Sequence, residues 1–118
     1  MEKQFDIGMT TREMLDTASG VLLAAEHTAE MHRRMIDEGF NPMHMTGEDM
    51  IAGFNGIMER YRHIVNLLMR EAIKHRSGID RTDLAALKQS RNSLFDYLIS
   101  THTKHVQAKH SAEGRGNS

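Results

Sequence analysis

The sequence contains no cysteine or tryptophan, and it has one proline, four phenylalanines and two tyrosines among 118 residues. Without cysteine, the chain can form neither disulfides nor thiolate metal sites, and its composition suits the reducing cytoplasm. The longest apolar run, residues 21–25, is far shorter than the roughly 20 residues that a membrane span requires. The first residues also lack the apolar core of a secretory signal. We therefore expect a cytoplasmic protein without a membrane segment.

Motifs that would indicate catalysis are missing as well. The sequence has no Gly-rich phosphate loop, no GxSxG nucleophile motif, no HExxH zinc motif and no EF-hand loop. The ExxH pairs of di-iron helical bundles are absent, because the Glu and His residues of Glu59/His63 and Glu71/His75 are four positions apart rather than three. We expect a protein that is not an enzyme and that needs no cofactor.

The remaining pattern indicates helices, and the first is expected over residues 11–38. Thr10 and Glu13 have capping-box spacing at its start. Gly39 suits a left-handed C-terminal cap, and Pro42 prevents continuation. Apolar residues recur with the helical period of 3.6, as Met14, Ala18, Val21 and Ala25.

Two further helices are expected over residues 47–77 and 81–107. Thr46 and Asp80 are suitable N-caps for them, and Gly78 ends the first of the two. In each helix the apolar positions again follow one face. In residues 47–77 they include Met50, Phe54, Ile57, Tyr61, Ile64 and Leu68, and in residues 81–107 they include Leu84, Leu87, Phe95 and Leu98. Gly53 and Gly56 leave open a kink or break in the earlier helix.

Three helices of similar length with short connections predict an all-α, antiparallel, up-down-up bundle. We expect a single domain over residues 10–110, preceded by a short leader, residues 1–9. Residues 111–118 are polar and glycine-rich and are expected to form a disordered tail. The apolar stripes are wider than one three-helix core needs, so we expect self-association into a homodimer or a larger bundle.

Eight histidines are the most informative polar residues. Antiparallel packing places His32, His102 and His105 at one end of the bundle, where the loop residue His44 can join them and Gly53 leaves room. Three imidazoles there can bind zinc or another borderline divalent ion, or can respond to pH. The plainer alternative is that histidines are simply tolerated at the wet end of a bundle.

Charged residues offer weaker hypotheses. Arg91 interrupts an apolar stripe, and we expect it to pair with Glu71; it can alternatively extend its head group to water or face a dimer partner. Residues 59–118 carry eleven Lys or Arg against six Asp or Glu. However, these basic residues do not share one helix face, and there are few aromatic residues for base stacking. The sequence therefore argues against nucleic-acid binding.

The apolar loop between the first two helices supports the leading functional hypothesis. Met-rich surfaces suit adaptable contacts with other proteins. We expect a helical interaction module, such as a small adaptor, chaperone or inhibitor, that binds another protein through Phe40, Met43, His44, Met45, His102 and His105. The second hypothesis is a metal-binding or pH-responsive bundle that uses His32, His102 and His105, and the third is nucleic-acid binding.

Overall fold

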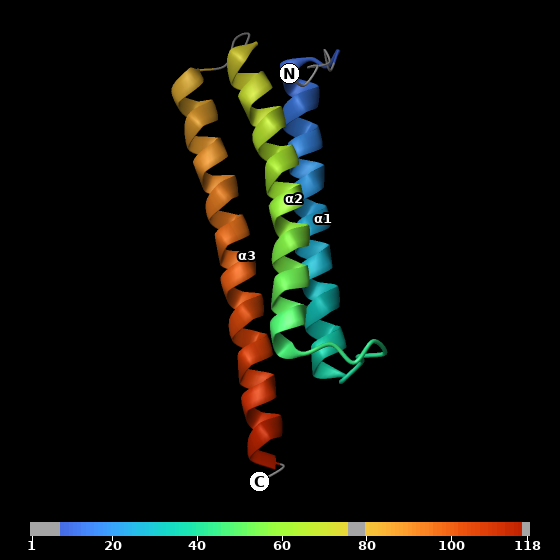
Figure 1. Ribbon diagram of the computed structural model, residues 1–118. Coiled ribbons are helices and arrows are strands. Elements are labelled where there is room, and N and C mark those ends of the chain that lie inside the picture. The colour runs from blue at the N-terminus through green and yellow to red at the C-terminus, as the bar shows by residue number, and fades with distance from the viewer. Residues whose placement is uncertain (1–7, 76–79, 117–118) are drawn as a thin grey trace, which may run out of the picture.

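The computed structural model describes residues 8–75 and 80–116, and these residues form an all-α bundle without strands (Figure 1). Helix α1 covers Thr11–Asp37, α2 covers Gly47–Lys74 and α3 covers Arg81–Gly116. The helices alternate in direction, as predicted, and give an elongated molecule of 61 × 29 × 22 Å. None of the described helices is long and apolar enough to cross a bilayer.

Local hydrogen bonds explain where the helices begin. The Thr10 hydroxyl accepts from the Glu13 backbone N–H at 3.1 Å, and the Glu13 carboxylate accepts from the Thr10 N–H at 3.1 Å, which completes the predicted capping box. Thr46 caps α2 in the same way, through the Asp49 N–H. The Asp80 carboxylate accepts from the Thr82 N–H at 2.6 Å and starts α3.

Helix α3 is longer than expected. It continues to Gly116 rather than ending near residue 107, and so includes residues 111–116 of the expected tail. Residues 108–113 contain alanine, lysine and glutamate and neither proline nor glycine, so the helix can continue through them. Helix α2 passes through Gly53 and Gly56 without a break, because burial of Phe54 and Met58 outweighs a glycine penalty of about 1 kcal/mol each.

Other expectations fall outside the described residues. Residues 1–7, which make up most of the expected leader, are not described, and neither are residues 76–79, which include the proposed terminator Gly78. Within the described part, α2 ends at Lys74 with His75 as its C-cap. The His75 carbonyl accepts from the Thr11 hydroxyl at 2.9 Å and so ties the end of α2 to the start of α1.

Helix α2 lies between the other two helices and makes most of the contacts between helices (Figure 1). The core contains Phe54, Leu84 and Phe95 of the predicted stripes, and with them Met58, Val65 and Met69. Ile64 and Leu87, which were also predicted in the stripes, are exposed. Because the direction of the chain alternates, α1 and α3 run parallel to each other. They approach each other less closely than either approaches α2, and this leaves a groove along one side of the bundle.

Candidate functional site

The loop between α1 and α2 has a defined conformation. Gly39 adopts a φ of 70°, as expected for a left-handed cap. Its N–H donates to the Ile36 carbonyl at 3.1 Å, and the Phe40 N–H donates to the Met35 carbonyl at 2.9 Å. These two bonds form a Schellman motif, which ends the helix and commonly brings the residue after the glycine against the last helical turn.

Asn41 holds the second half of this loop. Its side-chain amide donates to the Met45 carbonyl at 2.9 Å, and its side-chain oxygen accepts from the Met45 N–H at 2.9 Å. His44 occupies the left-handed region at a φ of 52°, within the span that Asn41 closes. The loop is therefore held at both ends by hydrogen bonds.

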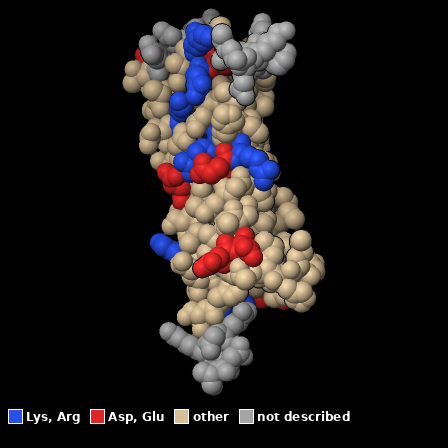
Figure 2. Space-filling view, in the orientation of Figure 1, with Lys and Arg blue, Asp and Glu red and all other residues tan. Residues whose placement is uncertain are grey.

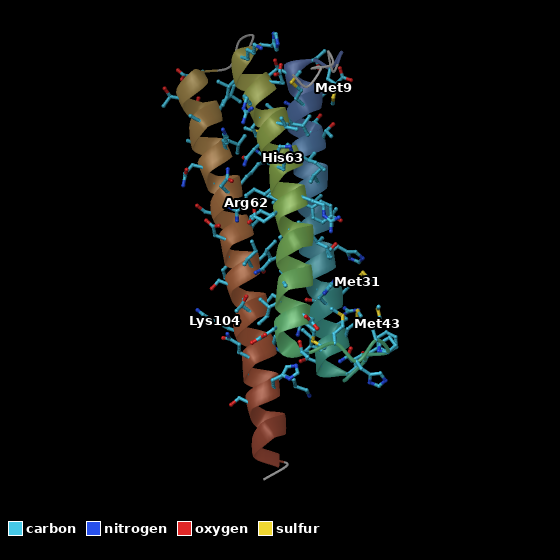
Figure 3. All side chains as sticks on the ribbon, viewed as in Figure 1. Met9, Met31, Met43, Arg62, His63 and Lys104 are labelled. Carbon is cyan, nitrogen blue, oxygen red and sulfur yellow. The ribbon has the colours of Figure 1, made fainter. Side chains whose placement is uncertain are left out.

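This ordered loop exposes large apolar side chains. Phe40 is 58% exposed and Met43 is 80% exposed, and Met43 projects from the end of the bundle in Figure 3. Beside them lies an apolar recess of about 130 Å³. We call Phe40, Met43 and this recess the loop-tip surface; its lining also includes Met35, Ile36, Met45 and Met50.

Of the three histidines that the sequence places at one level, two lie together beside the core, in a cluster to which each helix contributes one ring. The imidazole of His102 on α3 stacks on the Phe54 ring of α2, with centroids 3.8 Å apart and an interplanar angle of 15°. His32 of α1 meets both rings edge-on, at 5.4 Å from Phe54 and 5.9 Å from His102. Phe54 was predicted only as a core residue, because a helical wheel does not show ring stacking.

Burial makes His102 unusual. It is only 6% exposed, and neither of its ring nitrogens has a hydrogen-bond partner among the described residues. Desolvation, reinforced by the nearby His32 and His105, lowers the pKa of His102 to about 4. Desolvation also lowers the pKa of His32. His102 is therefore neutral at physiological pH, and its ring is buried among core side chains.

The third predicted histidine has a different partner. His105 Nε2 lies 2.8 Å from a carboxylate oxygen of Asp37, a residue that sequence reasoning missed. The sequence signal that could have indicated Asp37 was its position in the last turn of α1. The structure thus brings His32 and His102 together and turns His105 toward α1. Within residues 8–75 and 80–116, no group of three or more His, Asp or Glu side chains is arranged to hold a metal ion. Gly53 lies near Met45 rather than opening space for the histidines.

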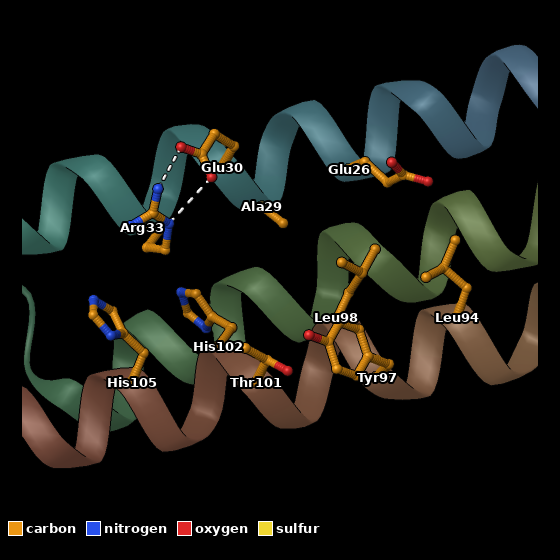
Figure 4. A pocket seen from close by; sticks show the side chains of 10 residues that line it. All are labelled: Glu26, Ala29, Glu30, Arg33, Leu94, Tyr97, Leu98, Thr101, His102 and His105. Atoms are coloured by element: carbon orange, nitrogen blue, oxygen red, sulfur yellow. Dashed lines mark hydrogen bonds and ion pairs between the residues drawn. The ribbon is translucent and has the colours of Figure 1, made fainter.

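A groove of about 300 Å³ runs between α1 and α3 beside this ring cluster (Figure 4). Leu94, Tyr97 and Leu98 give it an apolar side on α3. On the α1 side, the Glu30 carboxylate binds the Arg33 guanidinium (Figure 4). Hydrogen bonding to Arg33 lowers the pKa of Glu30. Glu26, one turn before Glu30 on α1, lines the same groove.

The predicted Glu71–Arg91 pair is wrong. Glu71 instead lies 3.2 Å from His75 Nε2 on its own helix. The Arg91 guanidinium donates to the Ser19 hydroxyl at 2.7 Å and to the Met69 sulfur at 3.7 Å. The sequence argument matched heights along the bundle, but the Arg91 side chain points around its helix toward α1.

On the face of the bundle shown in Figure 2, Lys and Arg gather mainly in the upper half, and acidic side chains lie beside them at mid-height. Arg62 bridges Asp96 at 2.6 Å and Glu59 at 3.6 Å. The charge of Arg62 is therefore used within the bundle.

Comparisons with protein-family models, with curated proteins and with solved structures found no match for this chain.

Proposed function

We propose that the protein is a non-enzymatic interaction module that binds another protein through its loop-tip surface. The observation that carries this proposal is the exposure of Phe40 and Met43 on a loop whose backbone is fixed by hydrogen bonds. Fixing the loop reduces the entropy lost on binding. Large exposed apolar side chains that cluster beside a recess are typical of contact sites.

The charges around the loop-tip surface indicate the chemistry of the partner. The exposed carboxylates of Glu38, Glu48 and Asp49 flank the loop on the ends of α1 and α2. A partner surface with apolar side chains ringed by Lys or Arg would complement this arrangement. We expect such binding to weaken as the salt concentration rises, because the exposed rim charges are screened.

This proposal narrows the predicted contact set. Phe40, Met43, Met45 and the exposed His44 remain in it. His102 does not, because its ring is buried against Phe54. His105 faces Asp37 in the last turn of α1, beside rather than within the loop-tip surface. The cytoplasm, the compartment that suits a chain without cysteine, is part of the same proposal.

The test uses the full chain as bait in its native host. The double variant Phe40→Ala/Met43→Ala should lose the specific partner, and binding of the purified partner should weaken by about tenfold or more. The matched control, Ile64→Ala/Leu67→Ala, removes two large side chains that are exposed on α2, far from the loop. If both variants retain the partner equally, the loop-tip surface is not the binding site.

A further inference from the structure

The groove between α1 and α3 extends beyond the region next to His102. A second stretch is lined by Leu22, Leu87, Arg91 and Leu94, and the two stretches meet at Leu94. From Leu87 to His105 the groove follows 18 residues of α3, or about 27 Å at 1.5 Å per residue. The groove is thus one long apolar face, separate from the loop-tip surface.

Two charges in this face have no oppositely charged neighbour. Arg91 is only 9% exposed, and its Nε has no hydrogen-bond partner in the part of the chain that the structure describes. Its other contacts are a hydroxyl and a sulfur, so no carboxylate among the described residues neutralises it. Glu26 is exposed at the edge of the groove and forms no ion pair in residues 8–75 and 80–116. A buried guanidinium without a carboxylate is strongly disfavoured relative to a paired one.

The positions of these charges along the bundle are related. The Arg91–Ser19 hydrogen bond places Arg91 at the height of Ser19 on α1. Glu26 lies seven residues farther along α1, about 10 Å away. Midway between the two charges lie Leu22 and Leu94. The face therefore carries a positive and a negative charge at equal distances on either side of these two leucines.

We propose that this groove is an interface between two copies of the chain, related by a two-fold axis that passes between Leu22 and Leu94. An axis that reverses the helix direction lays α1 of one copy antiparallel over α1 of the other, and α3 over α3. Glu26 of each copy then lies at the height of Ser19 on α1 of the other copy, beside the Arg91 guanidinium that donates to this serine, and this forms two equivalent ion pairs.

This arrangement accounts for the exposed residues around the groove. A two-fold interface uses one patch twice, so the patch must complement itself. Apolar contacts at the axis and opposite charges on either side meet that condition. Leu23 and Tyr97, which are 65% and 62% exposed, are close in sequence to Leu22 and Leu94 and so lie near the height of the axis. The second copy covers them.

The size of the face sets the expected strength of the dimer. Because the axis lies at Leu94, the groove overlaps itself over about seven residues on either side, or about 21 Å, and two helices of about 10 Å diameter then give roughly 420 Å² of projected face per copy. This is below the roughly 800 Å² per partner of a standard stable interface. We therefore expect a dissociation constant in the micromolar range, with monomer and dimer both populated in ordinary sedimentation experiments.

Sedimentation equilibrium of the full chain over a range of concentrations tests the proposal. Glu26→Lys places a cation opposite Arg91 and should raise the dissociation constant about tenfold or more. Glu38→Lys makes the same charge change outside the groove and should leave the dimer unchanged. A chain that stays monomeric throughout, or equal effects of the two substitutions, would overturn the proposal.

A double-mutant cycle locates the partner of Glu26. Arg91→Met removes the charge and keeps an apolar stem, and circular dichroism checks its fold. In the Arg91→Met background, Glu26→Lys should change the dissociation constant by less than about twofold. A tenfold effect that persists there would show that Glu26 acts on something other than Arg91. Because the loop-tip variants leave this groove intact, loss of the dimer and loss of a partner protein are separate results.

Discussion

Replacing His102 with leucine should remove much of the acid sensitivity of this fold. The imidazole lies between Phe54 and His32 and has no hydrogen-bond partner. In the folded chain its pKa is about 4, whereas in the unfolded chain it should be near the ordinary value of about 6.5. The unfolded state therefore binds the proton more readily, and the free energy of unfolding falls as the pH drops from about 6.5 toward 4.

The size of the effect follows from these two pKa values. At pH 5 the unfolded imidazole is largely protonated and the folded one is not, so stability falls by about 2 kcal/mol between pH 7 and pH 5. Glu30 contributes little in this window, because hydrogen bonding to Arg33 lowers its pKa from an ordinary value of 4.5 and its contribution to stability is lost only at more acid pH.

Urea unfolding at pH 7, 6 and 5, followed by circular dichroism, measures this difference. The wild-type chain should lose about 2 kcal/mol more than His102→Leu over that range. His32, whose pKa is also lowered, stays in the variant and keeps part of the slope. His63→Gln alters an exposed histidine (Figure 3) and serves as the control. Equal slopes for wild type and His102→Leu would refute the assignment of a buried, neutral ring.

Two further predictions concern the helices themselves. Gly20 lies inside α1 with open space where a Cβ would stand, so Gly20→Ala should raise the free energy of unfolding by about 1 kcal/mol. Gly39→Ala should lower it by a similar amount, because the residue has a φ of 70°; opposite shifts in melting temperature check both. Asn66 and Asn92 exchange side-chain hydrogen bonds of 3.2 and 2.9 Å between α2 and α3. A double-alanine cycle in urea should show a coupling of about 1 kcal/mol, and additive effects would contradict it.

Features determined by nearby residues were predictable from the sequence. Thr10 and Glu13 are three positions apart, and only local backbone geometry is needed to close their capping box. Gly39 ended the helix for an equally local reason. The meeting of His32 and His102 required only the up-down-up order, because equal rises along three antiparallel helices place them at one height.

The direction in which a side chain points around its helix was not predictable from the sequence. Height alone placed Arg91 near Glu71, but the side chain contacts Ser19 on the opposite neighbour. Sequence periodicity does not give the distance between two helices. The width of the apolar stripes was therefore the only sequence signal for the groove between α1 and α3. The stacking of His102 on Phe54 depends both on the direction in which each ring points around its helix and on the distance between α2 and α3. The burial of the His102 ring was therefore visible only in the packed structure.

The central functional claim is that the loop-tip surface contacts a different protein. A photoreactive phenylalanine analogue at position 40, and separately at position 97, tests it most directly in the native host. The two positions are similarly exposed, at 58% and 62%. Position 40 should crosslink to another protein with a Lys- or Arg-rimmed apolar surface, whereas position 97 should crosslink to a second copy of the chain. The same crosslinked species from both positions would contradict the claim.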